Sequence, residues 1–89
     1  MTGQFKPRRD VEIELDLHRL TVDEAMPLLH DYLDSACLAG LRQVRIVHGK
    51  GSGVLRQAVV RELKKQPVVR SYRPGGKGEG GDGATVVEL

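Results

Sequence analysis

A glycine-rich segment in the middle of the chain has the composition of a phosphate-binding loop. It runs from 48 to 53 as His-Gly-Lys-Gly-Ser-Gly, between an apolar run and an amphipathic stretch. Glycines let backbone N–H groups turn toward an anion, and the unpaired N–H groups at a helix start favour negative charge there. The segment does not fit the nucleoside-triphosphate loop, in which lysine precedes serine or threonine. We therefore predict that phosphate is bound by Gly49, Lys50, Gly51, Ser52 and Gly53.

Two histidines and an aspartate near predicted strand ends have the chemistry for phosphodiester hydrolysis. Imidazole titrates near pH ~6.5 and can act as a base or an acid near neutrality. On this basis His48 is the strongest proton-transfer candidate, and His18 and Arg19 complete a positive rim. Asp16 could orient either histidine, or bind a divalent cation together with the phosphate. The simpler alternatives are that Asp16 caps a turn or pairs with Arg19, and that His48 only ends its strand.

The elements that position these residues can be predicted from hydrophobic periodicity and breakers. Alternating apolar and polar residues at 11–17 predict a strand with one buried face. Residues 21–24 fit a capping box, and the helix that follows has an apolar stripe, a stop at Gly40 and a local bend at Pro27. The remaining elements are a strand at 44–47, a helix at 54–65 before Pro67, strands at 68–73 and 84–89, and a glycine-rich loop at 74–83.

This order predicts a two-layer α/β sandwich of the α+β type. Right-handed crossovers place both helices on one face of a four-stranded mixed sheet. Ligands in such sheets sit beyond the carboxyl ends of the parallel strands, which is where His18 and His48 fall. The loop at 74–83, which contains Lys77, is then either a flap over a bound strand or a disordered connection.

Length and composition fit a single domain, with 1–10 as a flexible basic tail and 11–89 as the folded unit. No apolar stretch approaches the roughly 20 residues that span a bilayer, and the start does not resemble a secretory signal. We therefore expect a cytoplasmic, nucleoid-associated location and no membrane partner. Cys37 is the only cysteine, which excludes an internal disulfide, and we interpret it as a reduced core thiol.

Charge is strongly segregated along the chain. Residues 10–34 carry many acids with Arg19 as the one base, whereas 41–73 carry many bases with Glu62 as the one acid. A basic face of this kind suits a polyanion, because each neutralised phosphate releases counterions. Arg42, Arg73 and Lys77 are therefore predicted to contact nucleic acid. The alternative is a dipolar, solvated surface.

The motifs together resemble the Smr (small MutS-related) domain. The resemblance covers nearly everything after Asp10 and is greatest for the version at the C-terminus of bacterial type-two MutS proteins. The residues that carry it are Leu15-Asp16-Leu17-His18, Leu38-Ala39-Gly40-Leu41, the run from Val44 to Gly51, and the run from Gly80 to Val87. The resemblance implies that this chain is an excised domain of a longer ATPase; the alternative is a small free-standing protein, which other members of the family are.

The same resemblance implies a fold like the C-terminal domain of translation initiation factor three. It also implies nucleic-acid binding, endonuclease activity and a role in recombination suppression or repair. The family's two motifs map onto 15–19 and 48–51, with one departure. Arg19 stands where the family usually has glycine, so it would either crowd the loop or add a phosphate contact.

Three function classes follow. The first is a structure-preferring, weakly sequence-specific endonuclease that nicks DNA, or an RNA endonuclease. The second is a non-catalytic module that anchors a larger ATPase to branched DNA or ribosomal RNA. The third, a small-nucleotide binder, lacks a suitably placed acid because Glu62 lies in the following helix. With Phe5, Tyr32 and Tyr72 as the only aromatics, binding is expected to be directed at the backbone. No cofactor is implied with certainty, and Mg²⁺ or Mn²⁺ is the candidate.

Overall fold

The computed structural model describes residues 11–89, so the basic tail predicted for 1–10, with its aromatic Phe5, lies outside the described residues. The elements alternate in the predicted order of strand, helix, strand, helix, strand and strand, with a short 3₁₀ turn before the last strand. They are β1 (Glu14–Asp16), α1 (Val22–Leu38), β2 (Gln43–Val47), α2 (Val54–Lys65), β3 (Ser71–Pro74), η2 (Gly81–Gly83) and β4 (Ala84–Glu88).

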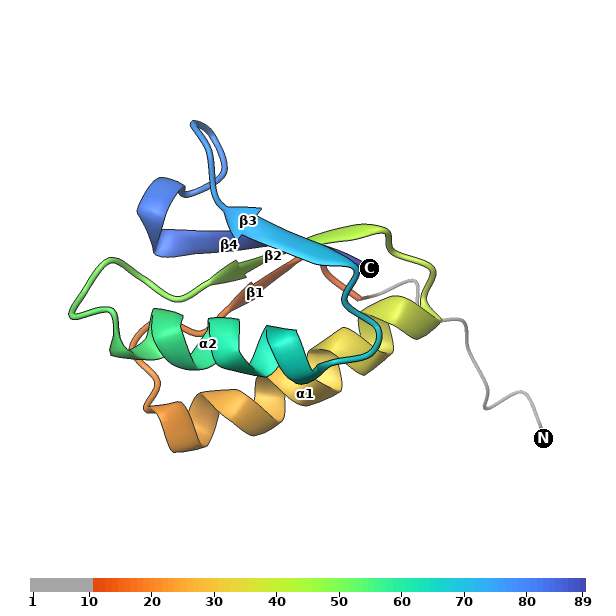
Figure 1. Ribbon diagram of the computed structural model, residues 1–89, viewed down its shortest axis with the longest axis horizontal. Coiled ribbons are helices and arrows are strands. Elements are labelled where there is room, and N and C mark those ends of the chain that lie inside the picture. The colour runs from red at the N-terminus through yellow and green to blue at the C-terminus, as the bar shows by residue number, and fades with distance from the viewer. Residues whose placement is uncertain (1–10) are drawn as a thin grey trace.

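The four strands form one mixed sheet in the order β1-β2-β4-β3. The first two are parallel, with Leu15 opposite Ile46, and β4 pairs antiparallel with both β2 and β3. Both helices cover the same face of the sheet, as predicted (Figure 1). Because β1 and β2 are parallel neighbours, their carboxyl ends lie at the same end of the molecule.

The first helix begins with the predicted capping box. The Thr21 hydroxyl accepts from the Glu24 backbone N–H at 3.2 Å, and the Glu24 carboxylate accepts from the Thr21 N–H at 2.9 Å. The helix runs through Pro27 to Leu38, and Gly40 follows with a φ of 83°. A local bend at Pro27 stays a prediction. The buried stripe of this helix and that of α2 pack on the sheet to form the core, with Leu17, Leu29, Leu33, Ile46, Val59, Leu63 and Val87 fully buried.

Two strand predictions were wrong at their ends. The first strand is confined to Glu14–Asp16, because Ile13 lies beyond the cover of the core and is 62% exposed. The third strand spans 71–74 rather than 68–73, since the chain turns after α2, where the Val69 N–H donates to the Gln66 carbonyl at 3.1 Å. Pro74 is tolerated in β3 because this is an edge strand.

Cys37 is exposed, so its interpretation as a core thiol was wrong. Cys37 lies four residues after the buried Leu33, but Ala36 is the last buried residue of α1, which ends at Leu38. The end of this helix extends past the core, since Leu38 is also exposed, and Cys37 is exposed with it.

The glycine-rich loop before β4 is tied down by its own side chains. Arg73 makes two hydrogen bonds to the Glu79 carboxylate at 2.8 and 3.0 Å, and the Gly76 N–H donates to the same carboxylate at 2.7 Å. These bonds lower the pKa of Glu79 to about 2. The loop is therefore an ordered connection rather than a disordered one.

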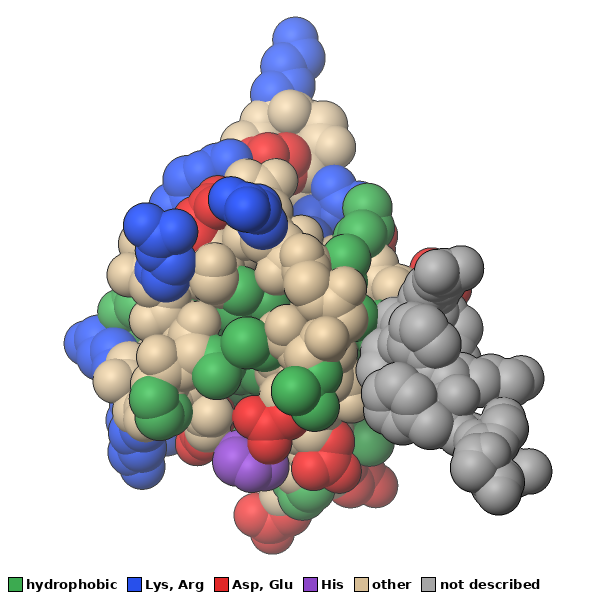
Figure 2. All heavy atoms as spheres, turned by 90° about the vertical axis from the view of Figure 1, so that its right-hand side faces the viewer, with side chains coloured by type: hydrophobic (Ala, Val, Ile, Leu, Met, Phe, Trp, Pro, Cys, Tyr) green, Lys and Arg blue, Asp and Glu red, His purple; other side chains and the backbone are tan. Residues whose placement is uncertain are grey.

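Charge is segregated in space as well as along the chain. Figure 2 shows the end of the molecule opposite the strand carboxyl ends, with acidic side chains gathered at the bottom, over α1, and basic ones along the left and upper edges. None of the helices found within residues 11–89 is long and apolar enough to cross a membrane.

Candidate functional site

A pocket of about 570 Å³ opens at the carboxyl ends of β1 and β2. It is lined by two stretches that are far apart in sequence, residues 18–22 and residues 48–56. They are in direct contact, since a Cβ atom built on Gly49 would lie 3.3 Å from the Cβ of His18. The two histidine segments therefore border one pocket, and their acting as one site stays a prediction.

Asp16 and His18 form a hydrogen-bonded pair beside this pocket. The Asp16 carboxylate accepts from the His18 ring Nδ1 at 2.5 Å and from the His18 backbone N–H at 3.0 Å. The side-chain bond is the main cause that lowers the pKa of Asp16. With its proton on Nδ1, the neutral ring presents Nε2 as a proton acceptor. Asp16 thus caps the turn and orients His18, not His48.

Arg19 adopts a left-handed backbone conformation with a φ of 75°, the only positive value outside glycine among residues 11–89. Such a conformation costs a residue with a Cβ atom about 1–2 kcal/mol, which explains why glycine is usual at this motif position. The Arg19 residue lines the pocket.

His48 is 5% exposed, and both ring nitrogens are engaged. Nδ1 lies 3.2 Å from the Gly49 carbonyl and Nε2 lies 2.9 Å from the Thr85 hydroxyl. A carbonyl can only accept, so Nδ1 carries the proton and Nε2 accepts from Thr85. Burial lowers the pKa of His48 and the charge of Arg56 lowers it further, against an opposing contribution from the bond to Gly49. His48 is therefore a neutral side chain that joins the glycine-rich loop to β4.

The backbone holds the same loop against the end of the Gly-rich connection. The N–H groups of His48 and Gly49 both donate to the Gly83 carbonyl at 2.9 Å. A Cβ atom on Gly83 would lie 3.2 Å from the Lys50 side chain, so glycine permits this close approach. The end of the 74–83 loop therefore borders the site, as the flap prediction requires.

The start of α2 is built to receive an anion. Gly53 is the N-cap, with a φ of 89° and no side-chain capping bond, and the first turn contains no acid. Its third residue is Arg56. A cavity of about 330 Å³ lies here, lined by residues 49–53, Arg56 and Asp82. The Val54 N–H donates to the Ser52 hydroxyl at 3.4 Å. The helix dipole, Lys50 and Arg56 favour a phosphate at this point.

A protein-only metal centre is not formed by the described part of the chain. Residues 11–89 contain no group of three or more His, Cys, Asp or Glu side chains that could hold an ion. Of three carboxylates in this part of the molecule, Asp16 is bonded to His18 and Glu79 to Arg73, while Asp82 lines the anion cavity. A divalent cation would have to take most of its ligands from substrate phosphates and water, as Mg²⁺ commonly does.

Three predicted nucleic-acid contacts are not brought to the pocket. Arg42 precedes β2 and His48 follows it, so the extended chain between the two residues spans about 20 Å. Arg73 is paired with Glu79, and Lys77 lies within the loop rather than along the pocket. Arg42 thus lies at the end of β2 opposite the pocket, and the contacts of these three residues with nucleic acid stay predictions.

Sequence reasoning missed two residues of the site. Arg56 lines it from the first turn of α2, and a base where helices prefer an acid was the available signal. Thr85 is bonded to His48, and nothing in the sequence marked it, because the contact depends on the register of β4 against β2.

Comparisons with known proteins agree on one family. Residues 15–89 match the model of the Smr domain. Proteins named Endonuclease MutS2 are 54% identical over 81 residues in Symbiobacterium thermophilum and 51% identical over 81 residues in Clostridium novyi. These matches cover 91% of this chain but only 10% of either relative, so the chain spans about a tenth of their length.

Two solved structures have the same fold. The crystal structure of the Smr domain of Thermus thermophilus MutS2 is 45% identical, with a TM-score of 0.82, and the match covers 85% of this chain and 95% of that one. YdaL, a stand-alone small MutS-related protein from Escherichia coli, is 32% identical with a TM-score of 0.83, over 86% of this chain and 63% of that one.

Proposed function

The chain belongs to the Smr domain family, and from this premise we propose that it binds DNA and nicks its phosphodiester backbone. The observation that carries the proposal is the contact between the Asp16–His18 pair and the glycine-rich loop across one pocket. The proton acceptor, His18, thereby lies beside the loop that would hold the anion. The endonuclease names of the relatives support the reaction class, and the resemblance noted above suggests recombination suppression or repair as its setting.

Each residue has a distinct task in this proposal. The N–H groups of residues 50–53, Lys50 and Arg56 hold the scissile phosphate and stabilise the charge that develops on its oxygens. His18 takes a proton from the attacking water at Nε2, while Asp16 keeps the ring oriented and stabilises its protonated form. The water oxygen bonds to phosphorus as the bond to the leaving sugar oxygen breaks, and that oxygen takes a proton from solvent. His48 positions the loop and moves no proton.

A divalent cation, if the reaction uses one, would be held by Asp16 together with the phosphate, and it would supply charge neutralisation there. Weak sequence preference follows from the same site, because its ligands are N–H groups and cations that contact backbone rather than base edges.

The decisive experiment compares histidine variants in a nicking assay on supercoiled and branched DNA. His18→Gln should lower the rate about 10²–10⁴-fold, because the general base is lost, while the dissociation constant stays within about twofold. His30→Gln is the matched control, since His30 is an exposed histidine on α1 that faces Asp34 and Gln66. Parallel reactions with a chelator and with structured RNA define the metal requirement and the substrate.

Wild-type turnover by highly purified His18→Gln would remove this residue from the chemistry. Salt-sensitive binding without cleavage by the wild type, on every substrate, would instead favour a non-catalytic anchoring module.

A further inference from the structure

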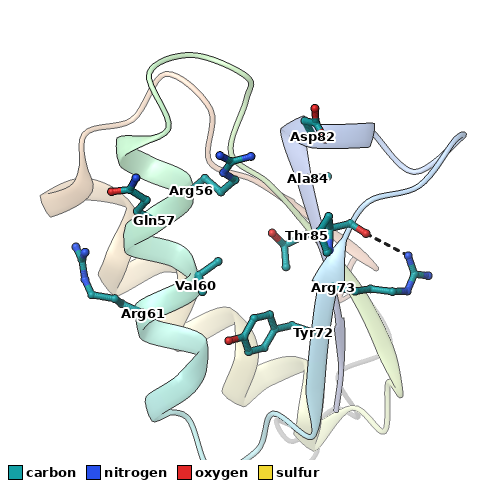
Figure 3. Close-up of a pocket in the computed structure, with 10 residues that line it drawn as sticks. Arg56, Gln57, Val60, Arg61, Tyr72, Arg73, Asp82, Ala84 and Thr85 are labelled. Atoms are coloured by element: carbon teal, nitrogen blue, oxygen red, sulfur yellow. Dashed lines mark hydrogen bonds between the residues drawn. The ribbon is translucent and has the colours of Figure 1, made fainter.

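A second groove, of about 460 Å³, lies between α2 and the edge strand β3. Figure 3 shows the Val60 side chain and the Tyr72 ring on opposite sides of it, with Thr85 above the ring on the sheet side and Arg56 at the end toward the glycine-rich loop. Tyr72 pairs with Val87 in the β3–β4 register and is half-buried, so its ring is supported from behind by the core. The groove thus combines two apolar walls with one cation at its end.

This groove is continuous with the site proposed for the scissile phosphate. Arg56 lines the groove and both cavities of that site. Thr85 lines the groove and bonds to His48, which orders the glycine-rich loop. A strand whose phosphate sits at the start of α2 therefore has an apolar slot immediately beside it.

The two tyrosines of the described chain lie in opposite electrostatic surroundings. Tyr32 borders a groove whose lining includes Glu12, Glu14 and Asp31, and its hydroxyl donates to the Glu12 carbonyl. Burial raises the pKa of Tyr32 to about 12, and the charges of Glu12 and Glu14 add to the effect. Such a groove repels a polyanion. Tyr72 instead lies in a groove lined by Arg56, Arg61 and Arg73, with Asp82 as its one carboxylate.

We propose that the Tyr72 groove receives an unpaired base from the DNA strand whose phosphate is held at the start of α2. The base stacks on the Tyr72 ring opposite Val60, and Arg56 holds the adjoining phosphate. Asp82 disfavours a phosphate on the β4 side, so the strand passes along the α2 side. A base inside a duplex cannot reach the groove without leaving its stack. The inference rests on the proposed function and narrows it to substrates with an unpaired nucleotide beside the cut, such as flaps and branch points.

Intrinsic fluorescence gives a direct test, because the chain contains two tyrosines and no tryptophan. In a Tyr32→Phe background, the emission comes from Tyr72 alone. A short single-stranded oligothymidylate should quench it, whereas an abasic strand of equal length and a blunt hairpin duplex should leave it nearly unchanged. Equal responses to the base-bearing and abasic strands would overturn the proposal.

Affinity measurements supply a second, independent test. Tyr72→Leu keeps the apolar wall but removes the ring, and it should weaken oligothymidylate binding about tenfold while changing abasic binding less than about twofold. Tyr72→Phe should restore wild-type affinity. Tyr32→Leu is the matched control in the acidic groove and should bind both strands like the wild type.

The two possible failures can be distinguished. If the wild type binds no DNA ligand at all, the proposed function fails and the groove with it. If the wild type binds all three ligands and Tyr72→Leu behaves like wild type, only the groove assignment fails. Circular dichroism of each variant checks that it is folded, and the Tyr32→Phe quenching experiment keeps the test valid should Tyr72→Leu not fold.

Discussion

The pocket is built from two strand–loop–helix segments that have the same order of elements. They differ in the surroundings of the histidine and in how the helix begins. Each has a strand, then a histidine, then the start of a helix. In the first turn His18 is exposed and paired with Asp16, and α1 is closed by its Thr21–Glu24 capping box. In the second turn His48 is buried and neutral, and α2 begins at an uncapped glycine.

The difference separates two tasks that a single turn could not perform together. A helix start whose N–H groups are satisfied by its own side chains cannot hold a phosphate, and α1 places Glu24 at its third position. At the third position of α2 stands Arg56. The first turn is thus suited to proton transfer and the second to anion binding, and their contact at Gly49 and His18 makes one site.

The largest effect is expected when α2 is given the acidic residue that α1 has at its third position. Arg56→Glu removes a cation from the anion cavity and adds a carboxylate to the helix start. We expect DNA affinity to fall about tenfold or more, and the salt dependence of log Kd to weaken by about one ion or more. Fluorescence anisotropy at several salt concentrations measures both. Arg42→Glu, at the other end of β2, is the control, and equal losses in the two variants would contradict the site.

A smaller effect is expected when the side-chain cap at the start of α1 is removed. Thr21→Ala breaks the capping box of α1, so the free energy of unfolding should fall by about 1 kcal/mol in urea denaturation. Ser52→Ala near the start of α2 should change it by less than about 0.5 kcal/mol, because the Ser52 hydroxyl makes one long, exposed bond of 3.4 Å to the Val54 N–H. Similar costs in the two variants would show that the helix starts do not differ as described.

The smallest expected effect is on the pH dependence of folding stability, to which the buried His48 contributes. The folded pKa of His48 is lowered, so the unfolded chain binds a proton near pH ~6.5 that the folded chain does not accept. His48 therefore contributes stability above that pH, and the stability is lost as pH falls from about 7.5 to about 5.5. His48→Gln should reduce this loss, as measured by urea midpoints at both pH values.

His30→Gln, at an exposed histidine on α1, is measured at the same pH values as the control variant. The pKa values of Asp16 and Glu79 are lowered, so protonation of these two carboxylates changes stability only at more acidic pH. A pH dependence unaffected by His48→Gln would mean that the buried imidazole is not the group responsible.

Elements with a strong local signal were predicted closely. The capping box at Thr21 and the bounds of α2 agree with the sequence pattern, since both depend on residues within one or two turns. Strand ends were predicted less well. Val68 and Val69 have strand propensity, but the chain leaving α2 must turn before it can pair with β4, so tertiary geometry overrides that preference.

The sequence around each residue was enough to determine which side chains could take part in chemistry and where the turns occur. Local backbone conformation requires glycine at 49 and 53, and the cap of α1 depends on residues only a few positions apart. Only the tertiary structure decided which histidine is available. Burial and the Thr85 contact come from β4, 37 positions away from His48, whereas the Asp16 partner of His18 is two positions away. Accessibility depends on what the rest of the chain packs against a residue, and sequence neighbours carry no information about that packing.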